Sequence, residues 1–133
     1  MPTMTAAQRR TADKAAYDVF VANCPSRQLL DRLSDKWVTL ALLALEDGPR
    51  RYSELSRTMA GVSQKMLTQT LRTLERDGLV TRTVTPSVPV TVTYEMTDLG
   101  RSLHDVVGLL KDWAERHMDL VLSARSEYDA TTR

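Results

Sequence analysis

Apolar side chains recur at the three- and four-residue spacing of α-helices along much of this chain. The first such segment, Thr5 to Phe20, is rich in alanine and predicts a short amphipathic N-terminal helix, with bounds of 5–22. The sequence Asn-Cys-Pro-Ser at 23–26 breaks that helix, and its proline or serine would start a second short helix from Gln28 to Leu33. Residues 36–46 are apolar on most sides, so we predict that this third helix is the buried centre of the domain, ended by the Asp-Gly-Pro that follows.

A short helix, a turn and a longer helix come next. The short helix is predicted over Ser53 to Met59, and the turn contains Gly61, which can adopt a positive φ. Ser63 would cap the longer helix, which is expected to end near Arg76. The leucines of this helix share one face and are expected to pack inward: Leu67, Leu71 and Leu74. This order of elements predicts a helix-turn-helix.

The period of the pattern changes after the longer helix. Residues 79–85 and 90–96 are rich in valine and threonine, which favours two strands. Residues 86–89 form a tip with two prolines, which suit a loop and protect the strand edges from unwanted pairing. One face of the second strand carries Val90, Val92, Tyr94 and Met96. A hairpin directly after a helix-turn-helix is a β-wing, so the predicted fold class is mainly α with a small β-wing (α+β), a winged helix-turn-helix.

The widest apolar stripe belongs to the C-terminal segment, where Thr97 is expected to cap a dimerisation helix over residues 97–123, with a loose polar tail over 124–133. The stripe is wider than one small domain is expected to cover. A second copy in a two-fold dimer would bury it together with the N-terminal helix, although the helix could also fold back on its own core. The expected interface residues are Leu103, Val106, Leu110, Trp113, His117 and Val121. The whole chain, 1–133, is interpreted as a single winged-helix domain with its helix-turn-helix core over 24–96.

Composition excludes several classes of protein. At 133 residues and 42% hydrophobic, the chain has material for one domain with a modest core. No stretch approaches the roughly 20 apolar residues of a membrane span, and no secretory signal is present, so we expect a cytoplasmic protein without a membrane partner. His104 and His117 lack the spacing of metal ligands, and no nucleophile motif or phosphate loop stands out. We therefore expect no metal, no cofactor and no enzymatic activity.

The net charge of +1 hides a local basic segment. Residues 50–82 contain seven basic and three acidic side chains, a net +4 against −3 for the rest of the chain. Such a patch is expected of a surface that contacts phosphates. Hydroxyl and amide side chains on the outward face of the longer helix can bond base edges, and the cations can reach phosphate or guanine. The residues expected to contact an operator in double-stranded DNA are Arg51, Ser63, Gln64, Lys65, Thr68, Gln69, Arg72, Arg82, Ser87 and Thr91.

Two alternatives stay open for this segment. The longer helix could be an ordinary amphipathic helix with a solvated polar face, and a winged helix could bind proteins without touching DNA. The glycine turn, the basic balance and the hairpin directly after the helix together favour DNA binding.

Four runs of this sequence resemble the HxlR family of bacterial transcription regulators, which is similar to the MarR group in its winged-helix fold. They are CPSRQLLDRLSDKW, DGPRRYSEL, GVSQKMLTQTLRTLERDGLVTRTV and VPVTVTYEMTDLGRSL, and the resemblance covers about Cys24 to Met118. It implies a homodimeric regulator that binds near-palindromic operators, often as a repressor of nearby genes. The wing departs from the family, whose members commonly show a run such as YPEVPPRVEY. Here Thr91 replaces the usual arginine, which weakens the case for a charged minor-groove contact, and Arg82 is the nearest basic alternative.

Cys24 stands at a helix start, where the helix dipole stabilises a thiolate and lowers the thiol pKa. In several members of the family, a cysteine at the corresponding position senses quinones, electrophiles or oxidants. Without a second cysteine in the sequence, the options are a bridge between subunits, a mixed disulfide, a sulfenic acid or alkylation. The alternative is a buried structural cysteine that behaves as a small hydrophobe. Control by a small ligand, bound between the dimerisation helix and the winged-helix body, is a further alternative.

Overall fold

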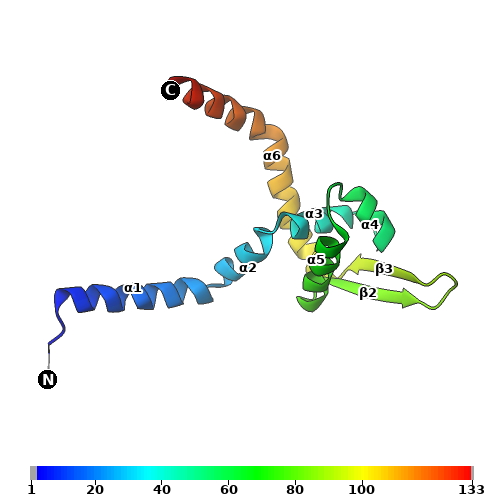
Figure 1. Cartoon of the computed structure of the whole chain (residues 1–133), viewed down its shortest axis with the longest axis horizontal. Helices are drawn as coiled ribbons and strands as arrows, with labels where there is room; N and C mark the ends of the chain where they lie inside the picture. Colours follow the sequence, from blue (N-terminus) through cyan, green and yellow to red (C-terminus); the bar gives the residue numbers. More distant parts are fainter. Residues whose placement is uncertain (1–2, 133) are drawn as a thin grey trace. The chain divides into compact units, whose positions relative to one another are not determined.

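The computed structural model describes residues 3–132, without the side chains of residues 19–23. Within these residues the chain forms six helices and a three-stranded antiparallel sheet (Figure 1). It divides into two compact units, Met1–Lys36 and Trp37–Arg133. The expected winged-helix core of residues 24–96 thus takes its first helix from the first unit. The interpretation of the whole chain as one domain stays a prediction.

The first unit contains helices α1 (Ala6–Asn23) and α2 (Pro25–Leu33). Thr5 and Gln8 cap the start of α1 reciprocally: the Gln8 N–H donates to Thr5 Oγ1 at 3.1 Å, and the Thr5 N–H donates to Gln8 Oε1 at 2.9 Å. Cys24 is the N-cap of α2, with extended backbone angles and a proline directly after it.

The sequence misjudged both helix boundaries around this break. Helix α1 continues to Asn23, one residue beyond the predicted helix of residues 5–22 and into the predicted break. Helix α2 begins at Pro25 and not at Gln28, so Ser26 lies inside its first turn and does not cap it. The reason is that proline, with its fixed φ and missing N–H, is well suited to the first helical position.

The second unit contains the remaining elements. In chain order they are α3 (Lys36–Ala44), β1 (Arg50–Arg51), α4 (Tyr52–Thr58), α5 (Gln64–Arg76), β2 (Val80–Thr85), β3 (Thr91–Met96) and α6 (Asp98–Thr131). The turn between α4 and α5 contains Gly61 at φ 88°, which confirms the predicted positive φ. The helix-turn-helix therefore consists of α4 and α5, and the β-wing consists of β2 and β3.

The sheet has the order β1-β3-β2. Its hairpin pairs Val80 with Met96 at the base of the wing and Thr85 with Thr91 near the tip. Strand β1 was not predicted, and it joins the sheet by pairing with Thr93 and Tyr94 of β3. This pairing attaches the start of α4 to the base of the wing.

The buried core residues of the second unit come from α3, α4, α5, the base of the wing and, through Val107, from α6. Three leucines of α5 are no more than 1% exposed, which confirms that this face packs inward: Leu67, Leu71 and Leu74. Helix α3 supplies Val38, Ala41 and Leu42. This helix ends at Ala44, earlier than predicted, although Leu45 in the following turn is still buried. Only one face of this helix is buried, since Leu40 is 40% exposed, so the helix is less central than its apolar sequence predicted.

Burial along β3 changes from the base of the wing to its tip. Tyr94 and Met96 are 7% and 6% exposed, Val92 is half-buried, and Val90 lies before the strand and is 62% exposed. The predicted alternation is therefore correct only where the strand lies over the core. Towards the tip, the hairpin extends beyond the helices of its unit (Figure 1), and both faces meet solvent.

Helix α6 begins against the turn that follows α5. Thr97 Oγ1 donates to the Gly78 carbonyl at 2.6 Å and accepts from the Gly100 N–H at 3.0 Å, which confirms the predicted cap. The Thr97 N–H donates to the Leu79 carbonyl at 3.0 Å. A Cβ atom on Gly100 would lie 2.0 Å from that same carbonyl oxygen. Only glycine permits this approach, so α6 is fixed directly to the C-terminal end of α5.

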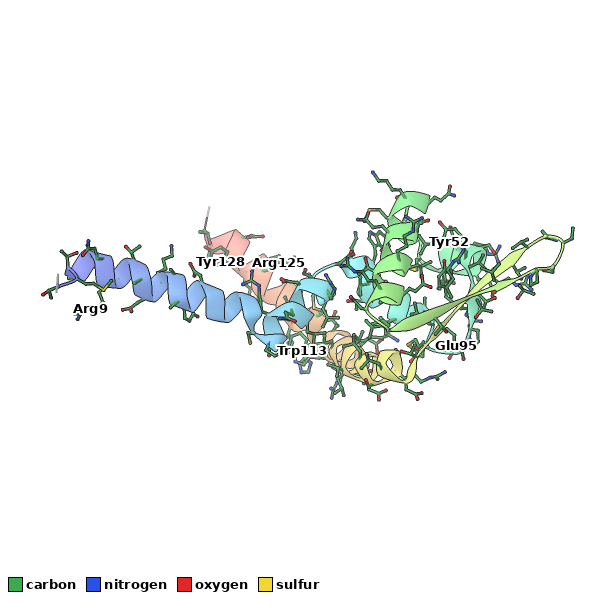
Figure 2. The ribbon with its side chains drawn as sticks, turned by 90° about the horizontal axis from the view of Figure 1, so that it is seen from below. Arg9, Tyr52, Glu95, Trp113, Arg125 and Tyr128 are labelled. Atoms are coloured by element: carbon green, nitrogen blue, oxygen red, sulfur yellow. The ribbon has the colours of Figure 1, made fainter. Side chains whose placement is uncertain are left out.

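The prediction of a loose tail after Ser123 is wrong as far as Thr131, because α6 continues to that residue. Figure 2 shows the side chains of Arg125 and Tyr128 on these last turns. Tyr128 is 66% exposed, so this part of the helix is held by its backbone hydrogen bonds and not by packing against the described residues. No helix among residues 3–132 is long and apolar enough to cross a membrane.

Candidate nucleic-acid interface

The outward face of α5 is polar and open to solvent. Ser63 caps the helix by accepting from the Met66 N–H at 3.1 Å, as the sequence predicted. Five of the residues expected to contact DNA line an open hollow of about 580 Å³ on this face: Gln64, Lys65, Thr68, Gln69 and Arg72. Thr68 is half-buried and the other four are exposed. Their exposure is what the sequence led us to expect, and their contact with DNA stays a prediction.

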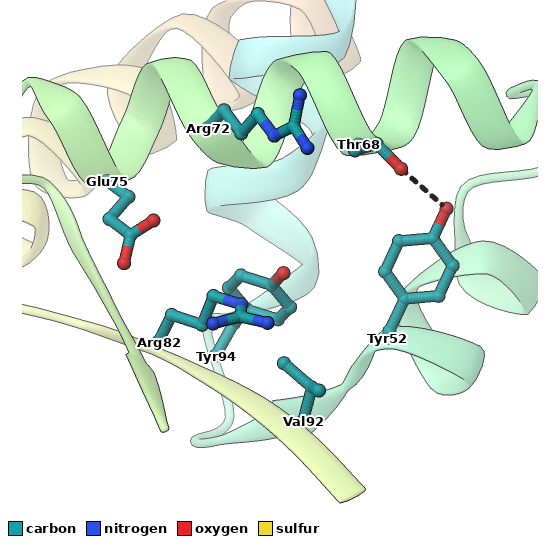
Figure 3. A pocket seen from close by; sticks show the side chains of 7 residues that line it. All are labelled: Tyr52, Thr68, Arg72, Glu75, Arg82, Val92 and Tyr94. Carbon is teal, nitrogen blue, oxygen red and sulfur yellow. Dashed lines mark hydrogen bonds between the residues drawn. The ribbon is translucent and has the colours of Figure 1, made fainter. Parts of the chain in front are cut away.

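A second hollow of about 430 Å³ lies between α5 and the wing (Figure 3). It brings together seven side chains from four elements: Tyr52, Thr68, Arg72, Glu75, Arg82, Val92 and Tyr94. Two guanidinium groups therefore face one space, one from the helix and one from β2. Neither guanidinium forms a salt bridge with Glu75 or with another carboxylate of the described residues. Both cations are free to meet the negative charge of a phosphate.

Tyr52 connects the two helices of the motif. Its phenol hydroxyl lies 3.1 Å from the Gln64 carbonyl oxygen and 3.1 Å from Thr68 Oγ1. Tyr52 and Glu75 were not predicted as site residues. No local spacing rule would have found them, because their place depends on how α4 and the wing pack against α5.

The other expected DNA contacts lie away from this space. Arg51 is exposed in β1, and its backbone N–H donates to Glu54 Oε1 at 3.1 Å. Ser87 is at the wing tip, where its hydroxyl donates to the Pro89 carbonyl at 2.8 Å. Thr91 is half-buried at the start of β3. Of the expected contacts outside α5, the structure brings only Arg82 to the pocket beside Thr68 and Arg72.

Cys24 is half-buried at the start of α2. Hydrogen bonds from the backbone N–H groups of Arg27 and Ser26 lower the pKa of the Cys24 thiol, against a smaller opposing effect of burial. At a given pH, a larger fraction of Cys24 is therefore thiolate than of an ordinary cysteine, as expected for a helix N-terminus.

Helix α6 exposes an apolar stripe within the second unit. Val106, Leu110 and Trp113 are 48%, 57% and 50% exposed, whereas Val107 is 1% exposed because it faces the core. The remaining expected interface residues are half-buried: Leu103, His117 and Val121. Three further exposed leucines of this helix were not predicted as part of the stripe: Leu109, Leu120 and Leu122.

The rings of Trp113 and His117 stack on this helix, with centroids 4.8 Å apart and planes inclined by 20°. His117 Nδ1 also lies 2.9 Å from the Trp113 carbonyl oxygen. The stack therefore presents one flat aromatic surface at the middle of the exposed stripe.

Comparison with known proteins identifies the family. A sequence model described as HxlR-like helix-turn-helix matches residues 32–121. This chain belongs to that family. YtfH of Escherichia coli strain K12, named as an uncharacterized HTH-type transcriptional regulator, is 42% identical over 110 residues, which cover 83% of this chain and 87% of YtfH.

Solved structures agree with this assignment. The transcriptional regulator ytfH from Salmonella typhimurium is similar with a TM-score of 0.74 and 45% identity, covering 80% of this chain and 96% of that protein. The redox regulator HypR in its reduced form is similar with a TM-score of 0.71 and 37% identity, covering 75% of this chain and 99% of HypR. The chain is thus a DNA-binding transcriptional regulator of the MarR-like winged-helix group and not an enzyme.

Proposed function

We propose that this HxlR-type regulator binds a near-palindromic operator as a homodimer and represses nearby genes. The observation that carries the proposal is the outward face of α5, where exposed hydroxyl, amide and cationic side chains adjoin a pocket with two unpaired guanidinium groups. Such a surface can read base edges in the major groove while the wing side of the pocket receives the DNA backbone.

A salt titration tests DNA binding by this face. The affinity for duplex DNA should fall steeply with increasing salt, because each phosphate contact releases counterions. Arg72→Ala should weaken binding about tenfold and make the salt dependence shallower by about one unit on a double-logarithmic plot. Arg125→Ala is the matched control, because this exposed arginine lies in the last turns of α6 and outside the family match. Equal binding by wild type and Arg72→Ala would contradict the assignment of α5 as the recognition helix.

The dimer is supported by the exposed stripe of α6. A single winged helix makes few base contacts, and two copies related by a two-fold axis would reach half-sites about 34–36 Å apart on one side of the duplex. Leucine, valine and tryptophan side chains that are half exposed in one protomer would then be covered by the second.

Control by oxidants, quinones or electrophiles through Cys24 is the further part of this proposal. Its support is the lowered pKa of the thiol and the similarity to HypR, which is named as a redox regulator and is solved in reduced and oxidised forms. The sequence contains a single cysteine, so an intrachain disulfide cannot form. A bridge between the two Cys24 residues of a dimer, a mixed disulfide or alkylation would then change DNA affinity.

The pH dependence of alkylation tests the reactivity of Cys24. Because its folded pKa is lowered, the rate of modification by iodoacetamide should reach half its maximum at a lower pH in the folded protein than in the urea-unfolded chain. Cys24→Ser should also abolish any release of DNA by diamide in a gel-shift assay. Identical pH midpoints in the folded and unfolded chain, or unchanged diamide release from Cys24→Ser, would argue for a structural cysteine.

A further inference from the structure

Thr68 is accessible from two sides of α5. It lines the hollow on the outward face of α5 together with Gln69. It also lines the hollow between α5 and the wing, the inner pocket, together with Tyr52. Figure 3 shows the hydroxyl of Tyr52 pointing at the hydroxyl of Thr68 across the inner pocket. Thr68 therefore hydrogen-bonds Tyr52 on one side, while its other side faces the space where the bases of DNA would lie.

The direction of this hydrogen bond follows from counting protons. A phenol hydroxyl carries one proton, and a backbone carbonyl can only accept. The bond from Tyr52 to the Gln64 carbonyl at 3.1 Å therefore uses the tyrosine proton. In the second contact, at 3.1 Å, the phenol oxygen must accept, so the Thr68 hydroxyl is the donor. The single hydroxyl proton of Thr68 is thus directed towards Tyr52.

We propose that Tyr52 determines base specificity by fixing Thr68 as a pure hydrogen-bond acceptor towards DNA. A free threonine hydroxyl can rotate and either donate or accept, so it bonds any base edge. With its proton held by Tyr52, Thr68 keeps only lone pairs for the major groove. Donors in that groove are the exocyclic amino groups of adenine and cytosine, whereas guanine and the thymine carbonyl present acceptors. Thr68 would therefore select adenine or cytosine over guanine or thymine at the base that it faces.

This inference rests on the proposed function, because it assumes that α5 enters the major groove. Tyr52 is a positioning residue in this scheme, since it acts on DNA through Thr68. A purely structural role for Tyr52 would instead predict a uniform loss of affinity at all base pairs. The two roles differ in which base pairs respond, and that difference can be measured.

The experiment begins with wild-type protein and a randomised library of duplex DNA, from which bound sequences are selected. The selected duplex and all its single-base-pair variants are then titrated with wild type and with Tyr52→Phe, which removes only the hydroxyl. We expect Tyr52→Phe to reduce the preference for adenine or cytosine at one base pair of each half-site by about two- to tenfold. This factor corresponds to the net contribution of one neutral hydrogen bond. Preferences at the other positions and the salt dependence should stay as in wild type.

Two further variants link the effect to Thr68. Thr68→Val keeps the branched shape without the hydroxyl and should lose the preference at the same base pair. The double variant Tyr52→Phe/Thr68→Val should lose no more than Thr68→Val alone, because the effect of Tyr52 passes through Thr68. Tyr128→Phe is the matched control: this exposed tyrosine lies in the last turns of α6, away from the pocket, and its hydroxyl has no hydrogen bond to the described residues.

Three outcomes would overturn the inference and leave the proposed function intact. They are unchanged base preferences in Tyr52→Phe, effects of Tyr52→Phe and Thr68→Val at different base pairs, and a uniform loss at all positions of the selected duplex. A wild-type protein that enriches no sequence from the library would instead overturn the proposed function and, with it, this inference.

Discussion

Replacing Gly100 by alanine is expected to destabilise the protein by about 2–4 kcal/mol. The new methyl group would lie 2.0 Å from the Leu79 carbonyl oxygen and 3.0 Å from its carbonyl carbon. This carbonyl cannot move aside cheaply, because it is backbone and accepts the Thr97 N–H at 3.0 Å. Relief of the clash therefore requires that the first turn of α6 moves away from the end of α5, which also breaks the bond from Thr97 to Gly78.

Gly108→Ala supplies the matched control within the same helix. A Cβ atom at Gly108 meets nothing within 4 Å, so alanine there should stabilise the helix by about 0.5–1 kcal/mol. The measurement is urea unfolding followed by circular dichroism at one fixed protomer concentration, because dimerisation would otherwise shift the midpoints. If Gly100→Ala unfolds at the wild-type urea concentration, α6 does not begin where the structure has it.

Helix α5 could be predicted from sequence because its signals are local. A capping serine, a glycine turn and three leucines at helical spacing all lie within residues 61–76, and each specifies the same helix independently. The same is true of the Thr97 cap of α6, whose side chain accepts from an N–H three residues later. Agreement between several local rules is what made these elements predictable.

Strand β1 could not be predicted, because two residues contain no periodic pattern. Arg50 and Arg51 are extended because they pair with Tyr94 and Thr93, which are distant in sequence. The inner pocket has the same origin. The outward face of α5 and Arg82 could be found from residue types, but the place of Tyr52 opposite Thr68 depends on that pairing, which holds the start of α4 beside β3.

The end of α6 was misjudged for a different reason. The apolar pattern stops near Ser123, and the polar segment that follows was interpreted as loose. A helix needs only backbone hydrogen bonds and residues that tolerate helical angles, and the segment from Ser123 to Thr131 contains no glycine or proline to stop it. Apolar periodicity therefore showed which part of α6 has a buried or exposed apolar face, but not how far the helix extends.

Replacing Leu110 by glutamate is expected to convert the proposed dimer to a folded monomer and to weaken operator binding at least a hundredfold. Leu110 is 57% exposed in one protomer, so the new carboxylate costs the isolated fold little. In the proposed dimer the same carboxylate would be buried without a partner, which costs several kcal/mol. A monomer reaches one half-site, so specific affinity should fall together with dimerisation.

Light scattering coupled to size-exclusion chromatography measures the mass of the Leu110→Glu variant, and circular dichroism shows whether it is folded. Ser126→Glu places the same carboxylate on the same helix at an exposed polar position outside the apolar stripe, and it should stay dimeric and bind DNA as wild type does. A Leu110→Glu protein that is dimeric and fully active would show that another surface joins the protomers. A folded monomer with full operator affinity would show that one winged helix suffices, and the two-fold arrangement would then have no part in DNA recognition.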